Sequence, residues 1–116
     1  MGMRSMQLVV SATAMTACLV SVDVSAVTGR SDLEKWCTHG TAVASGTCFG
    51  YLLAAQDALT RDRVMGVRAC LPVKIELPEK HRIVLDWLKE NPQVKDGSVF
   101  DLVVLAYTAR YPCAVP

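Results

Sequence analysis

The chain has 116 residues, of which 52% are hydrophobic, and its formal net charge is +1. Twelve basic residues against eleven acidic ones provide no basic excess of the kind that a phosphate-binding surface needs, which argues against nucleic acid as the partner. A chain of this length forms one small domain, whose limited core gains stability from covalent links.

The first 26 residues have the three parts of a secretory signal. Arg4 supplies a positive start, residues 8–22 form an apolar core, and Val24-Ser25-Ala26 offers a cleavage site made of small residues. The apolar core is 15 residues long, whereas a membrane-spanning helix needs about 20. We therefore predict a cleaved signal peptide over residues 1–26.

Cleavage after Ala26 would release residues 27–116 as a single domain into the periplasm, with no further membrane attachment. Lipoprotein anchoring at Cys18 is a weaker alternative, because the chain stays apolar after this residue and lacks the leucine usual before such a cysteine. Four cysteines follow the leader, and exported chains with an even set usually pair them as disulfides. They are Cys37, Cys48, Cys70 and Cys113.

Helical periodicity covers most of the chain after the leader. The sequence Ser31-Asp32-Leu33-Glu34 fits a capping box at the start of one helix, which Gly40 would end. A second helix is predicted from about Ser45 to Thr60. Its apolar residues recur at intervals of three and four and so share one face; they are Cys48, Leu52, Ala55 and Leu59.

Two more helices are predicted after a less regular stretch over residues 64–75. Pro78 suits the first turn of a helix over 78–91. Ser98 and Asp101 can cap a final helix over 98–110, which is apolar nearly all round and should be the buried centre. The solvated face predicted for the helix over 78–91 carries Lys80, Arg82, Asp86, Lys89 and Glu90. The predicted fold class is therefore all-α, a small disulfide-linked bundle of about four helices.

Helix geometry favours one of the three cysteine pairings. If the last two helices form an antiparallel hairpin, Cys70 and Cys113 become neighbours. Cys37 and Cys48 would lie about 16 Å apart on one continuous helix, well beyond the ~7 Å limit for a disulfide, but a break at Gly40 would let them meet. We therefore prefer Cys37–Cys48 with Cys70–Cys113, while the other two connectivities remain open.

The order of several short motifs resembles the Tai/Rap family of type VI secretion immunity proteins. The motifs are Cys48-Phe49-Gly50-Tyr51, Asp57-Ala58, Cys70-Leu71-Pro72 and Tyr111-Pro112-Cys113. Together they cover about residues 37–113. The chain departs from the family pattern at Ala54, where glycine is common, and at Tyr111, where phenylalanine is usual. Both changes are mild for the fold.

The resemblance implies a periplasmic, non-enzymatic immunity protein. Its partner would be a cognate secreted peptidoglycan amidase of the papain-like type, whose substrate groove it blocks, often as a homodimer. In this family the helix matching residues 78–91 and the loop after it are implicated in binding. The candidate contacts are Gln93, Lys95, Asp96, Arg82, Asp86 and Lys89. The plainer interpretation is that residues 91–97 are an ordinary connection between helices.

Catalytic and metal-binding interpretations are weak. Cys37 and His39 are near each other in sequence, but a disulfide-bonded sulfur cannot act as a thiolate nucleophile. A metal site built from these two residues and His81 lacks paired ligand spacing. We therefore predict no catalytic residue, no metal and no cofactor. The alternative function is a small periplasmic acid-stress chaperone or another periplasmic binding protein, although the near balance of acids and bases does not favour an acid-triggered role.

Overall fold

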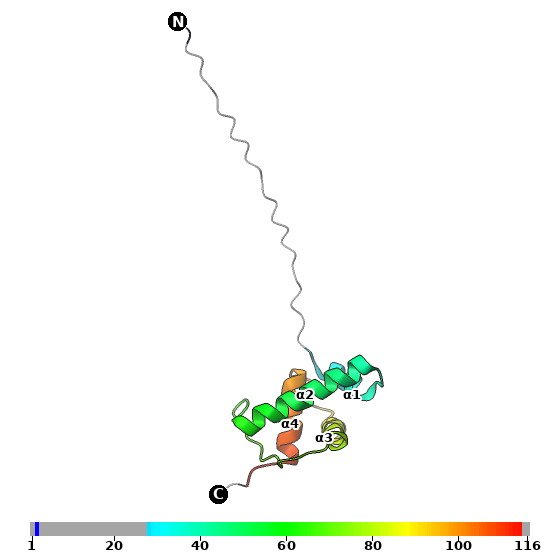
Figure 1. The fold of residues 1–116 in the computed structure, drawn as a ribbon, viewed down its shortest axis with the longest axis vertical. Coiled ribbons are helices and arrows are strands. Elements are labelled where there is room, and N and C mark those ends of the chain that lie inside the picture. Colours follow the sequence, from blue (N-terminus) through cyan, green and yellow to red (C-terminus); the bar gives the residue numbers. More distant parts are fainter. Residues whose placement is uncertain (1, 3–27, 115–116) are drawn as a thin grey trace.

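The computed structural model describes residue 2 and residues 28–114, and it contains four helices (Figure 1). They are α1 (Arg30–Thr38), α2 (Ala42–Arg61), α3 (Leu77–Glu90) and α4 (Val99–Arg110). Over the described residues no regular strand forms, and β pairing is limited to two isolated bridges. The predicted all-α class with about four helices is confirmed. Apart from residue 2, the predicted signal peptide lies outside the described residues.

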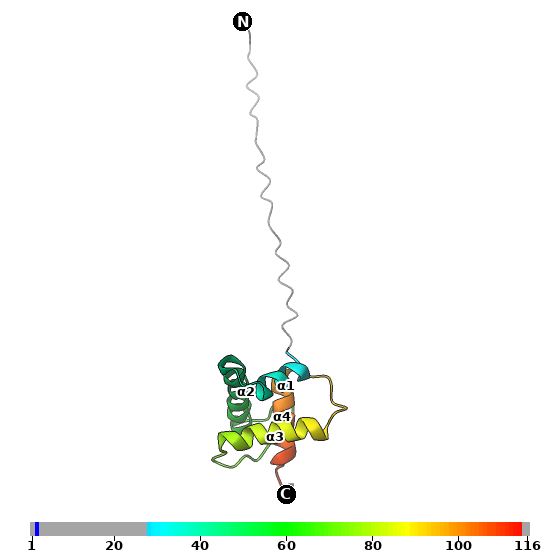
Figure 2. The same ribbon diagram turned by 90° about the vertical axis from the view of Figure 1, so that its right-hand side faces the viewer.

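Helix α4 is the centre of the bundle, as its apolar sequence predicts. It packs against each of the other three helices (Figures 1 and 2). The helix begins where the Ser98 hydroxyl accepts the N–H of Asp101 at 3.2 Å, so the predicted cap is confirmed. Its buried side chains lie on several faces; they are Val99, Leu102, Val103, Val104, Ala106 and Tyr107. A helix surrounded in this way has no room for charged residues in its middle turns.

Helix α2 presents the predicted apolar face to this centre, since Cys48, Leu52, Ala55 and Leu59 are all buried. Across the same interface the buried Tyr107 hydroxyl donates a hydrogen bond to the Leu52 carbonyl oxygen at 3.1 Å. Burial raises the pKa of Tyr107 well above its usual range, and the nearby Tyr111 adds to this effect. The bond satisfies a hydroxyl that would otherwise be a costly polar group inside the core.

The start of α1 differs from the prediction. The predicted Ser31 cap was wrong: the helix begins at Arg30, two residues earlier, with Gly29 as its N-cap, because the Asp32 carboxylate accepts the N–H of Gly29 at 2.9 Å and so closes the first turn there. Beyond α1, the Thr41 hydroxyl accepts the N–H of Ala44 at 3.2 Å and starts α2. The break between these helices lets the chain reverse.

The first disulfide joins α1 to α2 across this reversal. Cys37 and Cys48 are bonded, with their Cα atoms 5.2 Å apart. Beside them the rings of Trp36 and Tyr51 stack with centroids 5.8 Å apart. The short helix α1 is thus held to α2 by a covalent bond and by an aromatic contact.

The second disulfide has the preferred partners but a different structural cause. Helices α3 and α4 do not form the expected antiparallel hairpin: α4 runs steeply across α3 (Figure 2). Cys70 and Cys113 meet, with Cα atoms 4.9 Å apart, because the two extended segments that carry them pair. The Cys70 N–H donates to the Tyr111 carbonyl oxygen at 2.9 Å, next to the bridge between Ala69 and Pro112.

Helix α3 begins with Pro78 in its first turn, as predicted. The predicted solvated face was wrong for one residue: Lys80 is only 7% exposed. A long aliphatic stem allows lysine to lie along the bundle in this way. Elsewhere on that face Arg82, Asp86 and Lys89 are exposed, as expected. Among residues 28–114, none of the helices combines the length and the apolar character that crossing a membrane requires.

Candidate partner-binding site

The loop over residues 91–97 connects α3 to α4 at one side of the bundle (Figure 2). Its three predicted contact residues, Gln93, Lys95 and Asp96, are all exposed. Within the part of the chain that the structure describes, neither Lys95 nor Asp96 belongs to an ion pair. Their charges are therefore available to a partner.

The backbone of this loop is fixed by local hydrogen bonds. The Asn91 side-chain amide donates to the Trp87 carbonyl oxygen at 2.8 Å, which closes the last turn of α3. The Val94 N–H donates to the Asn91 carbonyl oxygen at 3.1 Å, which makes the next turn. Gly97 then adopts φ +114°, a conformation that side chains rarely permit, and leads into the cap of α4.

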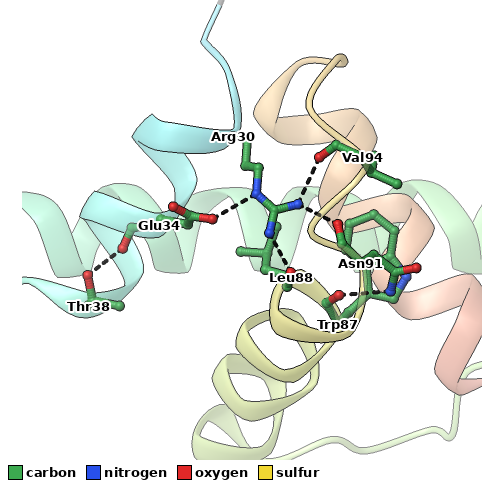
Figure 3. Close-up of polar contacts among 7 residues, drawn as sticks. All are labelled: Arg30, Glu34, Thr38, Trp87, Leu88, Asn91 and Val94. Carbon is green, nitrogen blue, oxygen red and sulfur yellow. Dashed lines mark hydrogen bonds and ion pairs between the residues drawn. The ribbon is translucent and has the colours of Figure 1, made fainter.

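A single side chain from α1 also secures the loop (Figure 3). Nη1 of Arg30 donates to the carbonyl oxygens of Asn91 at 2.7 Å and of Val94 at 2.8 Å. Nη2 donates to the Leu88 carbonyl oxygen, and Nε lies 2.8 Å from Oε1 of Glu34. The Arg30 side chain is only 16% exposed.

Planar guanidinium geometry explains why one arginine can make these contacts. Its five N–H donors have fixed directions, so Arg30 reaches three carbonyl groups and a carboxylate at once. Two of these carbonyls, from Leu88 and Asn91, belong to the end of α3, where a positive charge is also favourable to the helix dipole. The loop therefore has one defined shape before any partner arrives.

Sequence reasoning missed Arg30. The three carbonyl groups that it binds belong to residues 58 to 64 positions further along the chain. Every residue has a backbone carbonyl, so the sequence does not show which ones a side chain will bind. Only the i,i+4 spacing to Glu34 was visible, and such a pair by itself is typical of any exposed helix.

Lys95 and Pro92 line a hollow of about 520 Å³ that the loop forms with the start of α1. Arg30 and Glu34 line the other side of this hollow. The candidate site therefore includes residues from the start of α1 as well as from the loop.

The predicted contacts on α3 lie partly elsewhere. Arg82 and Asp86 line a separate hollow of about 250 Å³ between α3 and α4, together with Trp87 and Arg110. Arg82 is also 3.5 Å from the Glu79 carboxylate. Lys89 is exposed but lines neither hollow. The structure thus separates the six candidates into two groups. The loop group is Gln93, Lys95 and Asp96, and the α3 group is Arg82, Asp86 and Lys89.

The catalytic and metal-binding candidates from the sequence can be compared with the structure. Cys37, considered above as a nucleophile, is bonded to Cys48 and has no thiol to ionise. Over residue 2 and residues 28–114, no group of three or more His, Cys, Asp or Glu side chains could hold a metal ion. The features present are exposed charges on a fixed loop, which is the form of a docking surface.

Comparison with known proteins identifies the family. A family model described as Rap1a immunity proteins matches residues 29–113, from the residue before α1 to the last cysteine. Comparisons with curated proteins and with solved structures give no match to the chain. Membership of an immunity family implies that the protein binds a cognate effector. Because the match spans the whole helical domain, this chain belongs to the Rap1a immunity protein family.

Proposed function

We propose that this protein acts in the periplasm, where it binds and inhibits a peptidoglycan amidase delivered by a type VI secretion system. The match to Rap1a immunity proteins over residues 29–113 is the observation that carries this proposal. Its target would be a papain-like amidase, and its effect would be to protect the producing cell and its kin.

The form of the domain supports inhibition by docking. A rigid protein loses little conformational freedom when it binds, so more of its contact energy appears as affinity. Here one disulfide joins α1 to α2, the other joins the segment before α3 to the segment after α4, and Arg30 holds the loop over residues 91–97. We propose that Gln93, Lys95 and Asp96 enter the effector's substrate groove, while Arg82, Asp86 and Lys89 contact its rim.

Action in the periplasm is supported by the two disulfides, which persist in oxidising compartments. The proposal includes the cleaved leader over residues 1–26. It also includes a homodimer, which the family resemblance implies. Light scattering coupled to size-exclusion chromatography of the purified domain will measure the molar mass and so test the dimer.

A protection experiment tests the function and the compartment together. A sensitive bacterium would produce a candidate type VI amidase effector, directed to its periplasm, with or without the full-length immunity protein. We expect survival with the full-length protein and lysis with a version that starts at residue 27. Equal survival with both versions would contradict periplasmic action, and lysis in both cases would contradict immunity against that effector.

The chaperone alternative makes a different physical prediction. An acid-activated chaperone exposes apolar surface when the pH falls, and a hydrophobic dye reports that surface. We expect no rise in dye fluorescence before the domain unfolds. Dye binding by a domain that keeps its native near-ultraviolet circular dichroism at low pH would favour the chaperone.

A further inference from the structure

A tight hairpin follows α2 and is not used by the proposed effector site. Val64 and Val67 exchange two backbone hydrogen bonds of 2.9 Å, which leaves Met65 and Gly66 as a two-residue turn. Both turn residues have positive φ, +52° and +75°, as a type I′ turn requires. The turn presents the Met65 side chain to solvent, with 54% of the residue exposed.

Three arginines surround one hollow at the base of this hairpin. Arg61 ends α2, while Arg63 and Arg68 belong to the two arms of the hairpin, and all three line a cavity of about 510 Å³. Asp62 lines the same cavity, and its Oδ1 atom accepts the Arg63 N–H at 2.7 Å. In the described part of the chain, no ion pair involves any of these arginines.

This arginine hairpin, residues 61–68, holds more positive charge than the rest of the domain. Three arginines against one aspartate give the segment a formal +2. The other residues of 28–114 contain eight Lys and Arg against nine Asp and Glu, a formal −1. The nearly neutral total therefore conceals a local positive site beyond the C-terminal end of α2 (Figure 1).

We propose that the arginine hairpin is a second docking surface, which binds an acidic segment of another protein. Guanidinium groups bind carboxylates through two parallel hydrogen bonds, and they are less strongly hydrated than ammonium groups. Three of them around a hollow fit a segment with several carboxylates, and the exposed Met65 adds an apolar contact beside them. This surface is separate from the proposed effector contacts, because it shares no residue with the loop group or the α3 group.

A protein segment fits these features better than an anionic membrane does. Membrane-surface binding relies on a broad apolar face or on a cluster of four or more basic residues. The hairpin offers three arginines that face a hollow and one exposed apolar residue, Met65. A hollow of this kind receives side chains, whereas a flat lipid surface would leave it unfilled.

The test uses a fluorescent octaglutamate peptide as the probe, with octaglutamine as the neutral comparison. Fluorescence anisotropy measures affinity, and backbone amide shifts of the ¹⁵N-labelled domain locate the contact. We expect binding of octaglutamate only, with shifts concentrated in residues 61–68. The double variant Arg63→Gln with Arg68→Gln should bind about tenfold more weakly, since it removes two charge-assisted contacts.

A matched control separates a specific surface from overall charge. Lys35→Gln with Lys74→Gln removes the same number of positive charges from exposed positions outside both proposed surfaces, and it should change the affinity less than about twofold, because exposed distant charges are screened by salt. Equal weakening by both double variants, or amide shifts centred outside residues 61–68, would overturn the proposal. So would a failure of octaglutamate to bind while phosphatidylglycerol vesicles bind through the same arginines.

Discussion

Nη1 of Arg30 lies 2.8 Å from the carbonyl oxygen of Val94, a residue 64 positions further along the chain. This contact joins the first turn of α1 to the middle of the loop that we propose as the effector-binding element. The same guanidinium also donates to the Asn91 and Leu88 carbonyl groups, so this one side chain links α1 to both the end of α3 and the loop.

Arg30→Ala should destabilise the domain by about 2 kcal/mol, because it leaves three carbonyl groups without their charged donor. The amide hydrogen of Val94 should exchange faster, and effector affinity should fall as the loop loses its fixed shape. Chemical denaturation, hydrogen exchange and calorimetric titration with the effector measure these effects.

Lys35→Ala is the control for Arg30, since it removes an exposed basic residue from the same helix. It should change the free energy of unfolding by less than about 0.5 kcal/mol. Arg30→Lys keeps the charge but lacks the planar fork, so it should resemble the alanine variant in hydrogen exchange. Unchanged exchange at Val94 in Arg30→Ala would contradict the positioning role.

Reversing the two loop charges, Lys95→Glu with Asp96→Lys, should weaken effector binding by about tenfold, as expected for contacts near the centre of an interface. Because both side chains are exposed and the net charge is unchanged, the free energy of unfolding should stay within about 0.5 kcal/mol of the original.

The matched control for the loop reversal is Lys74→Glu with Glu76→Lys, which inverts an exposed ion pair of 3.1 Å in the segment before α3. It should leave the affinity unchanged. If the loop reversal has no effect on binding, or if the control weakens it equally, the binding site lies outside residues 91–97.

The two disulfides should contribute unequally to stability. The Cys70–Cys113 bond spans 43 residues, and the Cys37–Cys48 bond spans 11. Loop-closure entropy predicts losses of about 4 kcal/mol and about 3 kcal/mol when each pair is replaced by serine. Urea unfolding of the two double variants measures the difference, and a larger loss from the Cys37–Cys48 variant would show that entropy does not dominate.

Because of Tyr107, the free energy of unfolding should depend on pH in the alkaline range. Its raised pKa means that the folded protein keeps the phenol proton while the unfolded chain loses it near the ordinary value of about 10. The Tyr107 contribution is therefore fully present below pH ~10 and declines as the pH rises, by up to about 1.4 kcal/mol per unit.

Tyr107→Phe isolates this effect. The variant should be less stable by about 1 kcal/mol at neutral pH, since the Leu52 carbonyl loses its donor. Between pH 10 and 11.5 its free energy of unfolding should fall less steeply than that of the original protein. Parallel pH profiles for the two proteins would show that the Tyr107 proton is not retained in the fold.

Local patterns predicted the helices well. The spacing of apolar residues by three and four around Leu52 and Leu59 located α2. Ser98 with Asp101 located the start of α4, and Pro78 indicated the first turn of α3. Each of these signals depends only on residues within one or two helical turns of one another, so it can be read from a short stretch of sequence. The family resemblance also agreed with the match to Rap1a immunity proteins.

Long-range geometry was not predictable in the same way. The crossing of α3 and α4 depends on how side chains pack around the buried α4, and the meeting of Cys70 with Cys113 depends on backbone pairing beside Tyr111. The role of Arg30 was also hidden, because its loop acceptors are main-chain carbonyls. Backbone groups are the same at every residue, so no sequence pattern marks them as partners.

Inhibition of a peptidoglycan amidase by this protein can be measured by titrating the enzyme's activity. A candidate type VI amidase effector would cleave purified peptidoglycan in the presence of increasing amounts of the domain over residues 27–116. We predict that cleavage falls to background at an equimolar ratio, as expected for a tight inhibitor that occupies the substrate groove. Undiminished cleavage in the presence of a molar excess of the folded, disulfide-bonded domain would contradict the proposed inhibition.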